Sequence, residues 1–204
     1  NNYNKHLVYK NNDDLGMLVN ECNELLKHVS QHTEKLSSYS YEDALTGIGN
    51  RRYFQEQLEF HQRVAKRKNM TLSAIVFDLD YFKQYNDTYG HDAGDKVLQG
   101  FAKILDNTFT RDIDVVARTG GEEFIVLLLD NEQAQVIEFA NRVVASFFNQ
   151  NIPHSNSAIA DRVTVSAGVA SAEVNEQNTA ETVIIQADNA LYRAKHQGRN
   201  QVSQ

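Results

Sequence analysis

The chain has 204 residues, of which 41% are hydrophobic, enough to build one folded domain of common size and an appendage. Its formal net charge of -7 argues against a protein that binds the backbone of a nucleic acid polymer, so a nucleotide would be a small ligand. A single cysteine, Cys22, excludes an internal disulfide and a cysteine-based zinc site, and it fits the reducing cytoplasm. No apolar run approaches the roughly 18 residues of a membrane span. Because the sequence starts at Asn1 rather than at methionine, we expect a fragment of a longer protein.

The first element in chain order is a heptad pattern over residues 14–39. Two series of residues, each spaced by seven and offset by three, form its stripe: Leu15, Cys22, Val29 and Leu36, then Leu18, Leu25, His32 and Tyr39. Such a stripe usually packs against another helix, so we predict a parallel dimeric coiled coil. An amphipathic helix folded back onto its own domain is the alternative. We interpret His32 and Cys22 as residues of the seam. A polar break at residues 37–42 marks the predicted boundary between a helix over 1–42 and a domain over 43–204.

A turn-rich segment over residues 43–52 leads into a predicted helix over 51–67, with Asn50 or Thr46 as its cap. A short apolar strand over residues 72–77 follows and ends at Asp78 and Asp80. Acids at the rim of a core strand suit a metal site, although N-capping of the next helix by Asp80 explains the same pair. The remaining predicted elements are a helix around 83–87, a helix over 96–107 capped by Gly94 and Asp95, a helix over 131–149, a strand over 163–169, and a helix over 182–197 that Gly198 stops.

Residues 115–130 predict a β-hairpin, because the apolar runs 115–117 and 124–129 flank the pair Gly120 and Gly121. Paired glycines accept the positive φ that a tight turn requires. The tip carries Glu122 and Glu123, whose like charges repel, so we expect a cationic side chain nearby. Taken alone, the motif is equally consistent with a solvated acidic turn.

Five blocks along the chain, in order and sensibly spaced, resemble one family. They are D-A-L-T-G-I-G-N-R-R at 43–52, D-L-D-Y-F-K-Q-Y-N-D-T-Y-G-H-D-A-G-D at 78–95, R-T-G-G-E-E-F at 118–124, V-S-A-G-V-A at 165–170 and L-Y-R-A-K-H-Q-G-R-N at 191–200. Together they resemble the GGDEF domains of bacterial diguanylate cyclases, with Glu122 in place of the aspartate in the family's name. The resemblance implies an α/β, palm-like domain with a central, mainly antiparallel sheet wrapped by helices. It also implies that two GTP molecules on two facing domains are condensed to cyclic di-GMP, with release of two pyrophosphates.

The resemblance implies a site for Mg²⁺, with Mn²⁺ as a possible substitute. Asp78, the main-chain carbonyl of Leu79 and Glu122 would hold the metal, and Glu123 would complete a second metal site. Hard oxygen ligands of this kind suit magnesium and phosphoryl transfer. One of the two glutamates would accept the proton of the attacking 3′-hydroxyl, and the sequence leaves open which one.

The resemblance also implies a guanine pocket formed by Asn86 and Asp95, since the Asp95 carboxylate accepts from guanine N1 and N2, where adenine offers no matching donors. Gly120 and Gly121 would let the backbone approach the nucleotide. The triphosphate would meet the side chains of Lys83, Lys195 and Arg199 and the main-chain N–H groups of Tyr81 and Phe82. For Arg118 we favour a structural ion pair beneath the hairpin.

Arg111 and Asp114 match an R-x-x-D motif of the family, with five residues between Asp114 and Gly120. The resemblance implies an inhibitory site for cyclic di-GMP there, and a local surface ion pair is the alternative. Residues 13–18 and 23–26 resemble the second helix of a HAMP signalling module. That resemblance implies the cytoplasmic part of an inner-membrane receptor, in which a sensor upstream in the same chain sets how two catalytic domains of a homodimer face each other.

Two other functions compete with the cyclase. One is a catalytically silent GGDEF-like domain that binds GTP or cyclic di-GMP as a signalling module, and the other is a cyclase-type nucleotidyltransferase that uses ATP. The intact Gly120 to Phe124 motif, together with Asp78 and Asn86, favours an active enzyme, and Asp95 favours guanine.

Overall fold

The computed structural model describes residues 15, 17–27 and 41–204, and the chain divides into two units, Asn1–Tyr41 and Glu42–Gln204. In the first unit, residues 15 and 17–27 are helical, and the heptad residues Leu15, Leu18 and Leu25 are more than half exposed. Cys22 is exposed as well, and the remaining heptad residues, Val29, His32, Leu36 and Tyr39, lie outside the described residues, so the coiled-coil dimer stays a prediction. Within the described part of the chain, none of the helices is both long and apolar enough to cross a membrane.

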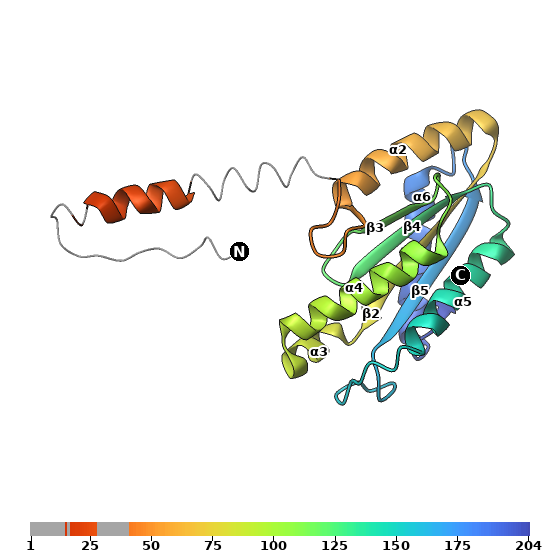
Figure 1. Cartoon of the computed structure of the whole chain (residues 1–204). Coiled ribbons are helices and arrows are strands. Elements are labelled where there is room, and N and C mark those ends of the chain that lie inside the picture. Colours follow the sequence, from red (N-terminus) through yellow and green to blue (C-terminus); the bar gives the residue numbers. More distant parts are fainter. Residues whose placement is uncertain (1–14, 16, 28–40) are drawn as a thin grey trace. The chain divides into compact units, whose positions relative to one another are not determined.

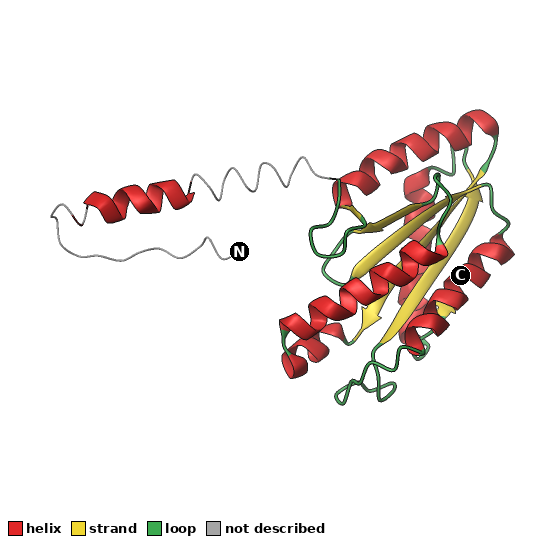
Figure 2. Cartoon of the chain, in the orientation of Figure 1, coloured by secondary structure: helices red, strands yellow, loops and turns green. Residues whose placement is uncertain are grey.

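The second unit is a six-stranded sheet between two layers of helices (Figures 1 and 2). Its strands are β1 (Gly49–Asn50), β2 (Thr71–Asp80), β3 (Val115–Arg118), β4 (Glu123–Leu129), β5 (Thr164–Glu173) and β6 (Val202–Ser203). Its helices are α2 (Arg51–Lys68), α3 (Phe82–Tyr89), α4 (His91–Thr108), α5 (Gln133–Phe148) and α6 (Ala180–His196). The strand order is β1-β3-β4-β2-β5-β6. The central pairs are antiparallel and the short edge strands pair in parallel, which confirms the predicted mainly antiparallel α/β sheet.

The two faces of the sheet build separate cores. On β2, Phe77 and Leu79 pack with the layer that contains α4 and α5, where Phe101 is fully buried against Phe77. Ala74 and Val76 pack instead with buried residues of α2 and α6. These two helices lie on the other side of the sheet from α4 and α5 (Figure 1). Because side chains alternate along a strand, Asp78 and Asp80 continue the face of Val76 and point toward the α2 and α6 layer.

Several predicted boundaries are confirmed and others are wrong. Asn50 caps α2, since its side chain accepts the N–H of Tyr53 at 2.9 Å. The predicted start of the helix at residue 96 is wrong, because α4 already begins at His91 after Gly90, whose φ is +83°. Gly94 and Asp95 therefore lie inside α4 and do not cap it. The capping explanation for Asp80 is also wrong, because Tyr81 is the N-cap of α3 and makes no side-chain capping bond.

Candidate active site

The antiparallel pairing of β2 with β4 brings the predicted acids together. In the register of β2 and β4, Asp78 lies opposite Glu123. The N–H of Leu79 donates to the carbonyl of Glu122 at 3.3 Å, which ties the hairpin tip to the end of β2. Three predicted acids, Asp78, Glu122 and Glu123, thus gather at one end of the sheet although more than 40 residues separate β2 from the tip.

Main-chain bonds and one arginine hold the hairpin tip. The N–H groups of Thr119 and Gly120 both point to the carbonyl of Glu123, at 3.0 and 3.4 Å. Neither Gly120 nor Gly121 has a positive φ, so the prediction that the turn needs glycine for a positive φ is wrong. Gly120 instead makes room for a neighbour, because a Cβ there would lie 2.6 Å from Oε2 of Glu123. At Gly121 a Cβ would meet nothing within 4 Å, which leaves open space over the turn.

Arg118 supports this tip from below, as predicted. Its Nε and Nη2 donate to the carbonyl of Gly121 at 3.1 and 2.7 Å, and its Nη1 lies 3.0 Å from Asp43. Partial burial opposes ionisation of Asp43, but hydrogen bonds from Thr46 and Arg118 outweigh it and hold the pKa of Asp43 below its usual value. Arg118 therefore has a structural role in the hairpin.

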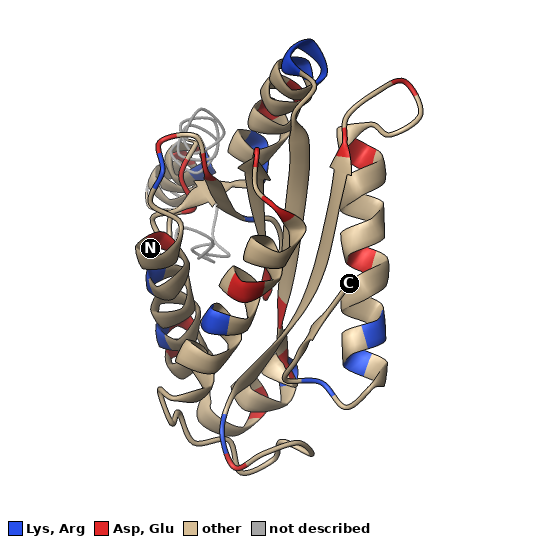
Figure 3. Ribbon diagram, turned by 90° about the vertical axis from the view of Figure 1, so that its right-hand side faces the viewer, with Lys and Arg blue, Asp and Glu red and all other residues tan. Residues whose placement is uncertain are grey.

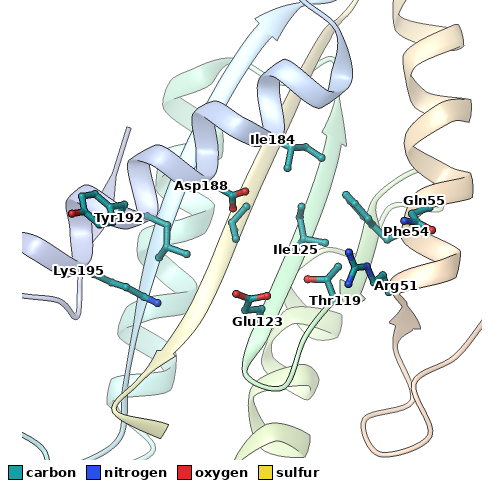
Figure 4. Close-up of a pocket in the computed structure, with 12 residues that line it drawn as sticks. Arg51, Phe54, Gln55, Thr119, Glu123, Ile125, Ile184, Asp188, Tyr192 and Lys195 are labelled. Atoms are coloured by element: carbon teal, nitrogen blue, oxygen red, sulfur yellow. The ribbon is translucent and has the colours of Figure 1, made fainter. Parts of the chain in front are cut away.

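Lys195 of α6 is the expected cation. Its Nζ lies 2.8 Å from Oδ1 of Asp78, and its side chain extends toward the end of the sheet that carries Glu123 (Figure 4). Burial raises the pKa of Asp78, and the ion pair with Lys195 counteracts only part of that rise. Burial also raises the pKa of Glu122, and the neighbouring charge of Asp78 adds to the effect. Burial is thus the main reason that both acids ionise less readily than exposed carboxyl groups, and Lys195 offsets part of its effect at each.

The basic end of α6 continues into the turn that carries Arg199 (Figure 3). The Arg199 guanidinium lies over the ring of Tyr81, with Cζ 4.5 Å from the ring centroid, and its Nε lies 3.9 Å from Oδ1 of Asp80. Asp80 is 2% exposed and accepts hydrogen bonds from Thr164, Ser166 and the N–H of Asn200 at 2.8, 2.8 and 3.2 Å. Burial raises the pKa of Asp80. Asp80 therefore holds the Arg199 turn against the sheet, a role that sequence reasoning did not assign.

Of the predicted guanine residues, Asn86 lies where α3 packs on α4, against Gly94. Oδ1 of Asn86 is buried and has no hydrogen-bond partner among the described residues. It lies where a side chain on Gly94 would be, because a Cβ there would overlap Oδ1 and lie 2.9 Å from Cγ of Asn86. Asp95, the next residue, is exposed on α4. The Oδ1 of Asn86 and the Asp95 carboxylate are both acceptors, the kind of group that pairs with an N–H donor of a ligand.

The other predicted residues lie in two places: on α3, and beside Leu129 at the end of β4 that is remote from Asp78. Lys83 is exposed on α3, whereas Phe82 is buried in the core and offers only its main chain. Arg111 and Asp114 form an ion pair, with Nη2 2.7 Å and Nε 2.9 Å from Oδ1. The Arg111 guanidinium also donates to Asn131 at 2.6 Å, so the R-x-x-D turn is held against the start of the α5 segment. The structure brings neither residue of the turn to Asp78.

Beside the acids, a cleft of about 470 Å³ opens between α2 and α6 (Figure 4). Its floor is apolar, with Val76 and Ile125, and Glu123 and Lys195 lie at its wall. The described residues include no group of three or more His, Cys, Asp or Glu side chains arranged to hold a metal by themselves. A metal at this site would therefore need ligands beyond the protein's side chains.

Comparison with known proteins identifies the family. The family described as "Diguanylate cyclase, GGDEF domain" matches residues 40–201. The chain belongs to this GGDEF family. Within it, diguanylate cyclase A of Treponema denticola is 36% identical over 181 residues, covering 87% of this chain and 48% of that protein. Response regulator PleD of Caulobacter vibrioides is 39% identical over 160 residues, covering 78% of this chain and 35% of PleD. The chain thus spans about a third to a half of the length of these curated GGDEF relatives.

Solved GGDEF structures share the fold. The active GGEEF domain of a diguanylate cyclase from Vibrio cholerae superposes with a TM-score of 0.65 at 30% identity, covering 76% of this chain and 95% of that one. The coiled coil and GGDEF domain of DgcB from Caulobacter crescentus, solved with c-di-GMP, superposes with a TM-score of 0.74 at 26% identity, covering 94% of this chain and 99% of that one. The palm-like cyclase fold predicted for the second unit is therefore confirmed.

Proposed function

We propose that this chain is a diguanylate cyclase that condenses two GTP molecules into cyclic di-GMP and releases two pyrophosphates. The observation that carries the proposal is the convergence of Asp78, Glu122 and Glu123 at the end of β2. The unpartnered acceptor of Asn86 supports guanine as the base. The active GGEEF domain of the Vibrio cholerae diguanylate cyclase carries the same G-G-E-E-F motif as this chain.

A divalent metal, Mg²⁺ or alternatively Mn²⁺, fits the residues present. Mg²⁺ is commonly bound by one or two carboxylates together with waters and substrate phosphates, rather than by a complete cage of side chains. Asp78, Glu122 and the carbonyl of Leu79 would hold it, with Glu123 at a second site. Burial raises the pKa of Asp78 and of Glu122, and a bound cation would favour the ionised form of both. When bound, the metal would supply charge neutralisation at the α-phosphate and the leaving pyrophosphate.

The protein's own groups would bind and orient the two nucleotides. Asn86 and Asp95 would hold guanine, and the exposed ammonium of Lys83 and the guanidinium of Arg199 would meet the triphosphate, with the N–H groups of Tyr81 and Phe82. Lys195 would exchange its contact with Asp78 for a phosphate oxygen. Gly121 would leave room for the nucleotide above the turn, and Gly120 would do so once the Glu123 carboxylate moves aside.

The bond-forming step needs a proton acceptor. The 3′-hydroxyl of one GTP would attack the α-phosphorus of the other, the bond to pyrophosphate would break, and the hydroxyl proton would pass to Glu122 or Glu123. Each domain would hold one GTP, so the enzyme would act as a homodimer. We also propose feedback inhibition by cyclic di-GMP at Arg111 and Asp114, which is supported by the c-di-GMP bound to a relative's GGDEF domain.

The upstream part of the proposal concerns residues 1–42. The heptad would form a parallel coiled coil between two copies, as part of a HAMP-linked receptor of the inner membrane with its GGDEF domain in the cytoplasm. A relative solved with its coiled coil covers 94% of this chain, which supports a helix at this position. An upstream sensor would then act by changing how the two catalytic domains meet.

The test separates the cyclase from the silent module and from an ATP-using enzyme. The purified 204-residue chain is incubated with GTP and Mg²⁺, and in parallel with ATP, and the products are resolved by mass. We expect cyclic di-GMP and pyrophosphate from GTP and no cyclic product from ATP. A dimeric sample that binds GTP without making a dinucleotide would refute the enzyme and leave the signalling module.

A further inference from the structure

The loop between α5 and β5, over residues 149–163, lies against α3 (Figure 1). The N–H of Ser155 donates to the hydroxyl oxygen of Tyr89 at 3.0 Å, and the side-chain amide of Asn156 donates to the hydroxyl of Thr88 at 2.8 Å. Both contacts reach the last turn of α3, the helix that carries Lys83 and Asn86. The loop therefore braces a helix whose first residues belong to the proposed nucleotide site.

His154, in the same loop, reaches the other end of α3. Its side chain is 0% exposed, and its Nε2 lies 3.2 Å from the main-chain carbonyl oxygen of Tyr81. A carbonyl oxygen only accepts, so Nε2 carries the proton and donates. Its Nδ1 is buried with no hydrogen-bond partner among the residues that the structure describes. The rings of Tyr85 and Tyr89 stand nearly perpendicular to the imidazole, with centroids 5.3 and 6.4 Å away.

The hydrogen bond from Nε2 of His154, rather than packing alone, explains a histidine at this position. A phenyl ring would fill the same space without an unpartnered nitrogen, and a buried polar group without a partner is costly. The bond from Nε2 is thus what the imidazole contributes that an apolar side chain would not. The Tyr81 oxygen accepts a second bond, from the N–H of Tyr85 at 3.0 Å, which starts α3. Both of its lone pairs are therefore used.

Tyr81 is also the residue that most needs such support. Its φ is +55°, in the left-handed region that side chains other than glycine rarely adopt, and it caps α3 without a side-chain hydrogen bond. The same residue carries the Arg199 guanidinium on its ring, with Cζ 4.5 Å from the ring centroid. A change in the backbone dihedral angles of Tyr81 would move both the first N–H groups of α3 and the Tyr81 ring on which the Arg199 guanidinium lies.

We propose that His154 is a positioning residue of the nucleotide site: by donating to the Tyr81 carbonyl it fixes the left-handed turn that aims the start of α3 and Arg199 at the triphosphate. His154 touches no substrate itself. The inference rests on the proposed function, because it assigns that function's phosphate groups to this turn.

The test compares His154→Met with His154→Gln in the full chain. The two replacements have nearly the same length, but the glutamine amide retains a donor near the position of Nε2 and methionine has none. We expect His154→Met to raise the KM for GTP about tenfold with kcat within about threefold of the unsubstituted protein, and His154→Gln to restore KM to within about threefold. Tyr89→Phe is the matched control, since it removes the link to Ser155 but keeps the ring against His154, and its KM should change less than about twofold.

Two kinetic results with these variants would overturn the proposal. One is an unchanged KM in His154→Met, and the other is a KM in His154→Gln as high as in His154→Met. A measurement on the unsubstituted protein does not depend on whether the variants fold: long-range ¹H–¹⁵N NMR must find the His154 ring with its proton on Nε2, and a neutral ring with its proton on Nδ1 would equally refute it. If the unsubstituted chain makes no cyclic di-GMP, the proposed activity has failed, and calorimetric titration of the same variants with GTP and Mg²⁺ still decides the role of His154.

Discussion

Gly94→Ala offers a sharp test of the guanine pocket, because it adds one methyl group at the contact between α3 and α4. That methyl would overlap Oδ1 of Asn86 and lie 2.9 Å from the Cγ of Asn86. It would also lie 3.1 Å from the Cζ of Phe82. The ring of Phe82 is buried in the core, so the Asn86 amide is the group that must move, by on the order of 1 Å. Losing the hydrogen bond of Asn86 to guanine, or misplacing it by this much, should raise the KM for GTP about 10- to 100-fold.

Gly100→Ala is its matched control on the same helix. A Cβ at Gly100 meets nothing within 4 Å, and alanine in place of glycine inside a helix adds about 0.5–1 kcal/mol of stability. We expect Gly100→Ala to raise the melting temperature and leave the KM unchanged. Initial rates of pyrophosphate release over a range of GTP concentrations, with a thermal melt of each variant, provide both quantities. A KM for Gly94→Ala within twofold of that for Gly100→Ala, in folded protein, would refute the placement of guanine against Asn86.

Three further predictions concern the charged groups. Arg111→Ala should raise the cyclic di-GMP concentration that half-inhibits the enzyme by more than about tenfold, and an unchanged value in an inhibition titration would eliminate the inhibitory site. Asp80→Asn replaces one of the two carboxylate oxygens on which several donors converge with an NH2 group that cannot accept, so we expect the free energy of unfolding in urea to fall by about 1–3 kcal/mol. Burial, joined for Glu122 by the charge of Asp78, raises the pKa of both acids, so protons compete with the metal at higher pH than at an exposed carboxyl. As the pH is lowered, activity should therefore begin to fall at a pH above the usual pKa range of carboxyl groups. Saturating Mg²⁺ should move this fall to lower pH, and Lys195→Met should move it to higher pH. A pH profile that Lys195→Met leaves unchanged would contradict the role of the ion pair.

Local patterns in the sequence predicted the elements well where one chemical signal dominates. The cap at Asn50 follows from a side-chain hydrogen bond within three residues, and the hairpin around Gly120 follows from its two apolar runs, although neither glycine has the positive φ that the prediction assumed. The family blocks predicted the meeting of Asp78 with the hairpin acids, which no local rule contains. The start of α4 was misplaced because Gly94 looks like a helix boundary, whereas its role is to let Asn86 approach.

The supporting contacts were not predictable in the same way. Asp80 finds its partners on β5 and after α6, and a single sequence holds no signal that pairs residues so far apart. His154 is a lone histidine in a polar loop, with nothing in its neighbourhood that points to Tyr81. Both depend on tertiary packing, which decides the partner only once the sheet has formed.

The acids of the proposed site stand on adjacent strands in fixed register, with β2 bonded along its length to both β4 and β5. Strands that are hydrogen-bonded on both sides move as one rigid unit, so a signal from another domain would not change the distance between Asp78 and Glu123. Catalysis would then be controlled from outside each domain. The controlled quantity would be how often the two GGDEF domains of the proposed homodimer meet in the productive orientation. A receptor built on this plan needs only to change an angle or a tether, and it can exchange one sensor for another without altering the chemistry that the sensor governs.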